Sequence, residues 1–476
     1  MRGALQELSR QKAEQFLNTF YFQYGHRSIA DLAHLAFAIE RISMLAAIAL
    51  VDEQRWDGQE RSSRYQDFGK SRYYTPTLPD ELKRRFVEVI DRCFEGYEIL
   101  SRACFENLSS TIVRPSDMPD DRYRRTLRAR AFDVARYLLP LATITSIGQI
   151  VNARTLENQI SRLASDKHGE VRRIAALLKE SAKSPPYNLA FERLKAFVEK
   201  LDSESVDSGR GQLSELFENP PVAPTLVKYA DAKDYDISRA QALDRAAAEI
   251  LSQIPIAAVE CVTLVKPENL EIELAATLLY EHSHHPYEQI LEVVGSLPVR
   301  IRQEIIDLGM KDRGRYDEVA RAYAAGAALQ FDLLVDTGAF RDLHRHRRCI
   351  QILQGYTAAH GYEMPSQVEQ AGLTRSYKGL MEDCRNLWGA LQDSRDADIA
   401  ASADYVLPLA FRRRALFKMD LAEAIYICEL RTAPGGHFSY RRIAFDMYEK
   451  LRRWYPEIAK GIRVHDVTEH MDILKR

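Results

Sequence analysis

The residues Asp52-Glu53-Gln54, seven further residues and then Ser62-Ser63-Arg64-Tyr65 form one stretch of this sequence. A second stretch of similar layout runs Arg345-His346-Arg347, seven residues and then Gly355-Tyr356-Thr357. A loop that holds a doubly charged phosphate needs hydroxyl and guanidinium donors close together. The first stretch has such donors at its end, and the second has its cationic cluster at its beginning. Each stretch therefore carries what the other lacks, and we expect the two to build one site together.

Length and composition indicate a protein with more than one domain. A chain of 476 residues is too long for a single ordinary core. Its hydrophobic content of 46% and charged content of 28% are typical of a soluble globular protein. The net charge of −2 gives no reason to expect general affinity for nucleic acid or membranes. Any anion site must therefore be a local cluster of cations.

Cysteine usage and the start of the chain favour a cytoplasmic location. The six cysteines are scattered without a Cys-x-x-Cys pair, which argues against a zinc or disulfide framework. The chain begins with a charged amphipathic stretch and not with the apolar region of a signal peptide. The apolar run from Met44 to Val51 is too short to span a bilayer.

Apolar spacing predicts several helices and one clear strand. A strand that ends in a turn is expected over Glu260–Pro267. The expected helices cover residues 5–18, 28–51, 81–109, 129–136, 170–182, 270–280, 288–294 and 319–328. Between about 201 and 230 the periodicity is lost, and Ser, Asp, Gly and Pro mark a linker.

The order of segments repeats along the chain. Leu138-Leu139-Pro140-Leu141 has a counterpart in Val406-Leu407-Pro408-Leu409. After each of them a long helix is expected, from about Thr143 in one case and over Ala415–Arg431 in the other. We interpret this as a degenerate internal duplication. The predicted domains are residues 1–200, here called the first copy, a linker with a helical segment at 201–255, and residues 256–476, the second copy.

Superimposing the two stretches yields Arg-His-Arg, seven residues and Ser-x-Arg-Tyr, which resembles the signature of the flavin-dependent thymidylate synthases. Further matches are Gly25-His26-Arg27-Ser28 and Glu429-Leu430-Arg431. The resemblance covers roughly residues 20–180 and 260–460. It implies a helix-rich α+β fold in which two homologous domains are related by a pseudo-twofold axis, and a homodimer that imitates the tetramer of the family.

The resemblance also implies roles for individual residues. Arg431 would be catalytic, because it would stabilise negative charge on the uracil ring. The implied substrate-binding residues are Glu60, Ser62, Arg64, Arg136, Asp342, Arg345 and Arg431. The implied cofactor-binding residues are His26, Ser28, Asn152, Arg154, Asn158, Arg345, His346 and Arg347. No metal site is expected, since His282, His284 and His285 lack a suitably spaced acidic residue.

The losses in the two copies are complementary. Asp52-Glu53-Gln54 replaces the cationic cluster in the first copy, and Asp404 stands in the second copy where the first has Arg136. One composite site therefore keeps its cations, whereas Coulomb repulsion should leave the mirror site without a phosphate ligand. Three departures from the family pattern stand out. Asp342 stands where the family has a glutamine. Arg162, in the first copy, matches the position of Arg431 only after a shift of one residue. The first copy also lacks a counterpart of the strand expected over Glu260–Pro267.

The implied reaction is the reductive methylation of dUMP, with FAD as cofactor and with NADPH and methylenetetrahydrofolate as cosubstrates. One alternative is another flavoenzyme that modifies C5 of a uridine nucleotide, for instance by hydroxymethylation. A second is a non-catalytic nucleotide- or flavin-binding descendant. A third is a basic surface for nucleic acid at Arg345 to Arg348, which the absence of interleaved aromatic residues disfavours. The partner expected is dUMP or a related uridine nucleotide, with no membrane and no nucleic acid.

Overall fold

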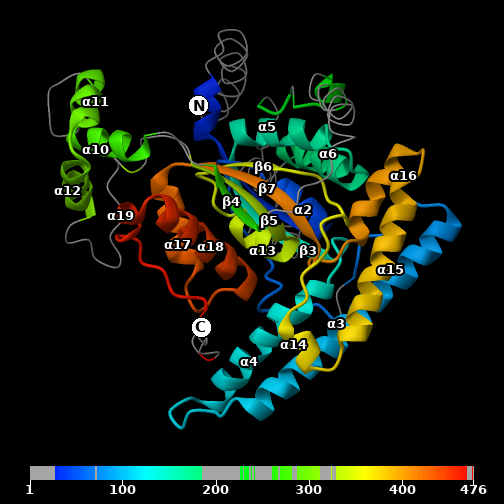
Figure 1. Ribbon diagram of the computed structural model, residues 1–476. Helices are drawn as coiled ribbons and strands as arrows, with labels where there is room; N and C mark the ends of the chain where they lie inside the picture. Colours follow the sequence, from blue (N-terminus) through cyan, green and yellow to red (C-terminus); the bar gives the residue numbers. More distant parts are fainter. Residues whose placement is uncertain are drawn as a thin grey trace, which may run out of the picture. The chain divides into compact units, whose positions relative to one another are not determined.

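A computed structural model describes residues 27–69, 72–184, 226–228, 230–234, 260–265, 269–280, 287–310 and 329–468, with the single residues 237, 238, 241, 323 and 474 (Figure 1). The chain divides into two compact units. Unit 1 comprises Met1–Ile42, Ala46–Glu60 and Thr145–Ile254, and unit 2 comprises Ser43–Leu45, Arg61–Ile144 and Pro255–Arg476. The helices predicted at 5–18 and 319–328 and nearly all of the predicted linker lie outside the described residues, apart from a few isolated positions.

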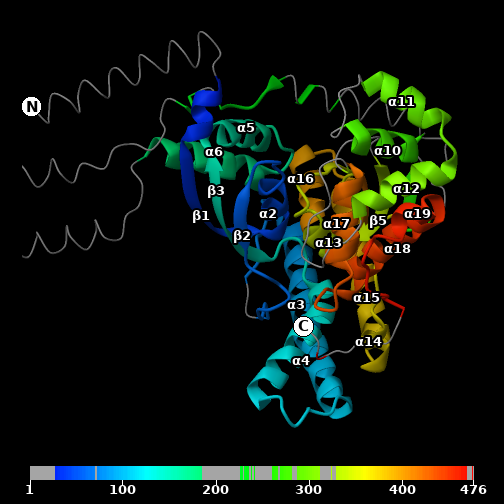
Figure 2. The ribbon, with the colours of Figure 1, turned by 90° about the vertical axis from the view of Figure 1, so that its left-hand side faces the viewer.

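The described part of unit 1 is a small sheet with helices. Its strands are β1 (His34–Ser43), β2 (Asp57–Glu60) and β3 (Ile144–Asn152), in the order β1-β3-β2. Along β3 buried side chains alternate with more exposed ones, as expected of a strand that packs one face on a core. The other elements are η2 (Arg27–Leu32), α2 (Met44–Leu50), α5 (Ala153–Ala164) and α6 (Gly169–Lys183), and Figures 1 and 2 show α5 beside α6.

Unit 2 is built around an antiparallel sheet in the order β4-β5-β7-β6. Its strands are β4 (Val262–Val265), β5 (Leu329–Asp336), β6 (Ile350–Leu353) and β7 (Arg412–Met419). The helices that matter for the site are α4 (Asp120–Ala135), η3 (Arg136–Leu138), α13 (Thr337–Leu343), α17 (Leu421–Arg431) and α18 (Phe438–Trp454). The others are α3 (Asp80–Thr111), α10 (Leu270–Tyr280), α11 (Tyr287–Ser296), α12 (Val299–Met310), α14 (Ser366–Gln370), α15 (Thr374–Gln392), α16 (Ala397–Ser402), η6 (Ala403–Val406) and α19 (Pro456–Ala459).

The predicted internal duplication reappears in the order of the elements. Both copies contain, in the same order, a strand, a short helix, a short strand, a long helix, a 3₁₀ turn, a strand and a helix. These are β1, α2, β2, α3, η3, β3, α5 and β5, α13, β6, α15, η6, β7, α17, with α4 as an additional helix in the first copy and α14 and α16 in the second. The strand orders β1-β3-β2 and β5-β7-β6 are equivalent. The strand registers also correspond. Asp57 lies five residues after the start of the stretch that begins at Asp52, and it pairs with Ile150. Ile350 lies five residues after the start of the stretch that begins at Arg345, and it pairs with Lys418. The mixed α+β class is confirmed.

Several helix predictions were confirmed and three were wrong in the same way. The predictions over 81–109, 170–182 and 270–280 correspond to α3, α6 and α10, and the predicted strand corresponds to β4. The region 28–51 is instead a 3₁₀ turn, β1 and α2, and both long helices expected after the Leu-Pro-Leu segments begin as strands, β3 and β7. Along β3 and β7, buried side chains alternate with more exposed ones, which is the pattern of a strand and not of a helix. Asn152 and Asp420 then cap the helices that follow, since each side chain accepts a hydrogen bond from a backbone N–H three residues on.

Within unit 2 the two Leu-Pro-Leu segments pair with each other. The backbone N–H of Leu141 donates to the carbonyl of Leu407 at 3.0 Å, and that of Leu409 donates to the carbonyl of Leu139 at 2.9 Å. Pro140 forms an isolated antiparallel β-bridge with Pro408, which is its counterpart in the second copy. Because the pairing is reciprocal, the two copies are related locally by a pseudo-twofold axis at this point. The long helix α3 packs against α4 and α15, and the three helices lie side by side in Figures 1 and 2.

Candidate functional site

Arg64, at the end of the first signature stretch, is buried at 7% exposure and holds four contacts. Its Nε and Nη2 donate to the two carboxylate oxygens of Asp133 in α4, at 2.7 and 3.2 Å. Its Nη1 donates to the hydroxyl of Tyr440 in α18 at 2.9 Å, and Nη2 also donates to the carbonyl of Gly435 at 3.1 Å. Burial by itself would lower the pKa of Arg64, but the carboxylate of Asp133 outweighs it and raises that pKa above its ordinary value. A residue of the first copy thus anchors the α17–α18 loop of the second.

Two further side chains secure the same loop. Arg130 of α4 donates to the carbonyls of Pro434 at 3.1 Å and Gly436 at 3.4 Å. His437 lies within hydrogen-bonding distance of the Asp133 carbonyl, with Nε2 at 2.8 Å, and its Nδ1 accepts from the backbone N–H of Ser439. These partners make Nε2 the protonated nitrogen. Burial, together with nearby Arg136 and Arg64, lowers the pKa of His437 well below its ordinary value, so the ring is neutral near pH 7.

Arg431, at the end of α17, is held from one side only. Its Nε donates to Nε2 of His346 at 2.8 Å, and Nδ1 of His346 lies 3.0 Å from a carboxylate oxygen of Glu423. The Arg431 guanidinium also lies 5.5 Å from the ring centroid of Tyr440, the same distance as the Arg64 guanidinium. The terminal amino groups of Arg431 form no hydrogen bond with any described residue. The side chain is only partly buried, so these donors are available to an anion.

Arg136, at the start of η3, has a buried donor without a partner. It is 2% exposed, and its Nη2 donates to the carbonyl of Gly338 at 3.2 Å and lies 3.5 Å from the carboxylate of Asp342 in α13. Its Nε forms no hydrogen bond, nor does the nearer oxygen of Asp342. Buried polar groups are normally satisfied. The orphaned Nε therefore fits a site completed by an acceptor such as a phosphate or pyrimidine oxygen.

The remaining predicted residues of the signature are more exposed. Arg345 lies two residues after the end of α13, is exposed, and pairs with no described side chain. Arg347 is half-buried. In the other stretch, the Ser62 hydroxyl accepts a hydrogen bond from the backbone N–H of Arg64 at 3.3 Å. Glu60 is the last residue of β2 and belongs to unit 1. Unit 2 itself thus brings together Ser62, Arg64, Arg136, Asp342, His346 and Arg431.

The other predicted cofactor ligands belong to unit 1. The side chain of Asn152 caps α5 by accepting from the backbone N–H of Thr155 at 2.8 Å. Arg154 lies 3.3 Å from the carboxylate of Asp31, and Asn158 is exposed one turn further along the helix. His26 and the side chain of Ser28 lie outside the described residues.

In unit 1, Glu53 and Arg162 of the first copy take the places that His346 and Arg431 have in the second copy. Glu53 holds the middle position of its stretch, as His346 does, and its Oε1 accepts from Nε and Nη2 of Arg162 at 3.0 and 2.8 Å. Arg162 therefore makes the contact that corresponds to the Arg431–His346 contact, despite the shift of one residue. A carboxylate occupies its guanidinium, so this position is an ion pair and not an anion site.

Replacing Arg162 by glutamine is expected to lower the free energy of unfolding by about 1 kcal/mol, because the ion pair is only partly shielded from water. Urea denaturation measures this loss. Affinity for nucleotide should stay within the experimental error of the unchanged protein. A large loss of nucleotide affinity would instead place a ligand at the Glu53–Arg162 pair.

Sequence reasoning missed Asp133, Glu423 and the contacts of Tyr440. Asp133 is 2% exposed and Glu423 5% exposed. A carboxylate within an otherwise apolar run is a usable signal, because a charge that is buried needs a partner. The run Ala131-Phe132-Asp133-Val134-Ala135 and the run Leu421-Ala422-Glu423-Ala424-Ile425 both show it.

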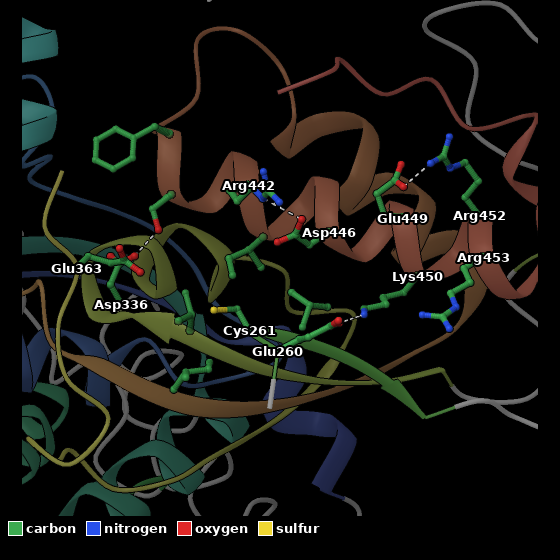
Figure 3. A pocket seen from close by; sticks show the side chains of 16 residues that line it. Glu260, Cys261, Asp336, Glu363, Arg442, Asp446, Glu449, Lys450, Arg452 and Arg453 are labelled. Carbon is green, nitrogen blue, oxygen red and sulfur yellow. Dashed lines mark hydrogen bonds and ion pairs between the residues drawn. The ribbon is translucent and has the colours of Figure 1, made fainter. Parts of the chain in front are cut away.

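A separate cavity of about 940 Å³ lies between β4, β5 and α18 (Figure 3). No predicted site residue whose side chain is described lines it. Several of its charged wall residues pair with one another, Arg442 with Asp446 at 2.9 Å and Lys450 with Glu260. Ser439 and Tyr440 are neighbours on α18, but only Ser439 faces this cavity, where its hydroxyl donates to Asp336.

Asp336 provides a pH-dependent prediction. Burial raises its pKa to about 6, against the opposing effect of the hydrogen bonds from Ser439 and from the backbone of Ala339. A carboxyl whose pKa is higher in the folded state stabilises the fold when protonated and loses this effect as pH rises through 6. Stability should therefore fall between about pH 4 and pH 6, by on the order of 3 kcal/mol from this group. Asp336→Asn keeps an oxygen for the helix cap, so urea denaturation at several pH values should show a smaller fall in this variant.

No membrane-spanning candidate and no metal site is found in the part of the chain that the structure describes. None of the described helices is both long and apolar enough to cross a bilayer. The described His, Cys, Asp and Glu side chains form no group of three or more that could hold a metal ion.

Fold and site together define a duplicated α+β protein with one arginine-rich cluster assembled from both copies. Residues 2–185 and 266–457 each match the family model described as thymidylate synthase complementing protein, and the chain belongs to that family. Both the resemblance inferred from the signature and the tandem arrangement are thereby confirmed.

Several known proteins are similar to this chain. A UPF0159 protein of Chlamydia muridarum is 28% identical over 481 residues, which cover 97% of this chain and 83% of that protein. A flavin-dependent thymidylate synthase of Clostridium tetani is 27% identical over 184 residues, 36% of this chain and 70% of that enzyme. Among solved structures, the UMP/dUMP methylase PolB of Streptomyces cacaoi bound with 5-Br dUMP matches 42% of this chain and 93% of its own, with 14% identity and a TM-score of 0.32.

Proposed function

We propose that this protein catalyses the flavin-dependent reductive methylation of dUMP to dTMP at one composite site per chain. The observation that carries the proposal is the cluster in unit 2, where Arg64 and Arg136 of the first copy and Arg431 of the second surround the α17–α18 loop and α13. Membership of the family and the similarity to flavin-dependent thymidylate synthases support the reaction class.

In this proposal the cations divide the work of binding. Arg431 presents its open guanidinium fork to the pyrimidine and stabilises negative charge that develops on the ring. Arg136 offers its orphaned Nε to an oxygen of the nucleotide. Arg64 is already neutralised by Asp133 and acts with Ser62 as an oriented donor at the phosphate and not as a free charge. Asp342, where the family has glutamine, presents a carboxylate and thus accepts a hydrogen bond from the substrate or from Arg136.

FAD would supply the redox chemistry, with NADPH and methylenetetrahydrofolate as cosubstrates. In unit 2 the residues proposed to contact FAD are Arg345 and Arg347. For unit 1 the family resemblance implies FAD contacts by Asn152, Arg154, Asn158, His26 and Ser28. Arg345 fits an anionic pyrophosphate best, because it is exposed and pairs with no described side chain. We further propose that the protein is a cytoplasmic homodimer.

The colour and redox behaviour of the purified protein test this function. The proposal expects a yellow protein whose flavin absorbance bleaches with NADPH and returns with dUMP plus methylenetetrahydrofolate, with dTMP formed. A product that carries a hydroxymethyl group would favour the alternative C5-modifying enzyme. Tight binding of nucleotide or flavin without reduction by NADPH would favour the non-catalytic descendant.

Titration with dUMP should give one nucleotide bound per chain. In the first copy Glu53, in place of a cation, pairs with Arg162, and in the second copy the fully buried carboxylate Asp404 replaces Arg136, so neither set offers a second phosphate the cations it needs. Isothermal titration calorimetry measures the stoichiometry directly. Two equivalent sites per chain would contradict the composite arrangement.

A further inference from the structure

Glu423 is a buried carboxylate that the proposed reaction leaves without a role. Its backbone N–H donates to the Asp420 side chain at 2.9 Å, so the start of α17 is already capped. The Glu423 side chain instead approaches Nδ1 of His346, at 3.0 Å. A carboxylate this well buried is costly unless a donor satisfies it. The contact to His346 is therefore the one that accounts for it.

The contacts of His346 determine which ring nitrogen carries the proton. Nδ1 faces a carboxylate, and Nε2 faces Nε of Arg431, which always bears a hydrogen. The neutral ring must then be protonated on Nδ1 and accept on Nε2. Burial lowers the pKa of His346 and the nearby charge of Arg431 adds to this, whereas Glu423 opposes it. The ring is thus held neutral and in one tautomer.

We propose that Glu423 is a positioning residue for Arg431 and acts through His346. This inference rests on the proposed function, in which Arg431 contacts the nucleotide. With its Nε bound to His346 and its guanidinium beside the Tyr440 ring, Arg431 keeps its two terminal amino groups for the ligand. Both nitrogens of His346 are used within the protein. The structure thereby assigns His346 to the orientation of Arg431 in place of the cofactor contact expected from the signature.

Three variants separate this role from a general effect of charge. In Glu423→Gln the amide oxygen can still accept from Nδ1 of His346, so the tautomer and the dUMP affinity should be largely retained. Glu423→Ala frees the ring to protonate on Nε2, which faces the Arg431 N–H. Loss of a hydrogen bond to a charged group should weaken dUMP binding by about ten- to a hundredfold. Glu429→Gln is the matched control, since Glu429 lies on the same helix and accepts from the backbone of Arg463.

Two measurements are needed for each variant. Isothermal titration calorimetry determines the dissociation constant of dUMP, and nitrogen-15 NMR of histidine-labelled protein reports the tautomer of His346, assigned with His346→Gln. The proposal expects the Nδ1–H tautomer in the unchanged protein and in Glu423→Gln, and loss of dUMP affinity in Glu423→Ala alone.

The outcomes distinguish this inference from the proposed function. An Nε2–H tautomer in the unchanged protein overturns the inference, even if Glu423→Ala fails to fold. Unchanged dUMP affinity in a folded Glu423→Ala protein overturns it as well. If the unchanged protein binds no dUMP but has the Nδ1–H tautomer, the proposed function fails while the orientation of Arg431 by Glu423 and His346 is supported.

Discussion

Arg431→Ala is expected to lower kcat for dTMP formation by about 10²- to 10³-fold, the usual cost of removing a donor aimed at developing charge. The melting temperature should change little. The side chain is partly exposed, and among the described residues it forms a hydrogen bond with His346 alone. Arg431→Lys keeps the charge but lacks Nε and the planar fork, so an intermediate loss is expected.

Steady-state kinetics measure these losses, and Arg442→Ala is the control. Arg442 lies on α18, is paired with Asp446 and lines the separate cavity. Its removal should leave kcat unchanged. Full activity of Arg431→Ala would remove Arg431 from the reaction and leave the cluster as a structural feature.

Asp133→Ala is expected to cost about 3–5 kcal/mol in the free energy of unfolding, because it leaves the buried guanidinium of Arg64 without its carboxylate. Exposed fractions of 8% and 3% for the two side chains mean that water does little to compensate. The double replacement Arg64→Met with Asp133→Leu should lose less than Asp133→Ala, since the buried Arg64 charge is removed together with its partner and only Arg130, at 3.9 Å, loses a carboxylate neighbour.

Urea denaturation measures these differences, and the same helix offers a control. Arg125 and Asp121 of α4 form an exposed pair with a contact of 2.9 Å. Asp121→Ala should cost less than about 1 kcal/mol. A cost this small for Asp133→Ala would mean that Arg64 finds another partner, and the α17–α18 loop would then not depend on this ion pair.

The sequence predicted the features that rest on local patterns. Long amphipathic runs identified α3 and α6. The first signature stretch and the match at Glu429-Leu430-Arg431 singled out Arg64 and Arg431, whose guanidinium groups both lie beside Tyr440. The same patterns misled where a strand passes directly into a helix. In Ile144–Asn152 and Arg412–Met419 the alternation passes directly into helical spacing. The change occurs at one capping residue, Asn152 in the first case and Asp420 in the second.

The network behind the arginines was harder to predict. Arg64 meets Asp133 over 69 residues of sequence and Tyr440 over 376. Neither separation leaves a periodic trace in the chain. The tautomer of His346 depends likewise on Glu423, which is 77 residues away. Such partners are set by tertiary packing, whereas the signature shows only the residues that they hold in place.

The reciprocal pairing of Pro140 with Pro408 has an evolutionary consequence. In an assembly of identical subunits, every substitution beside a twofold axis enters twice, so a change that suits one side is imposed on the other. Here the two sides are encoded separately. Arg136 and Asp404 occupy equivalent turns before this axis, and a cation on one side coexists with a carboxylate on the other. Because both copies lie in one chain, the symmetry constraint is absent and the two sides can differ in charge.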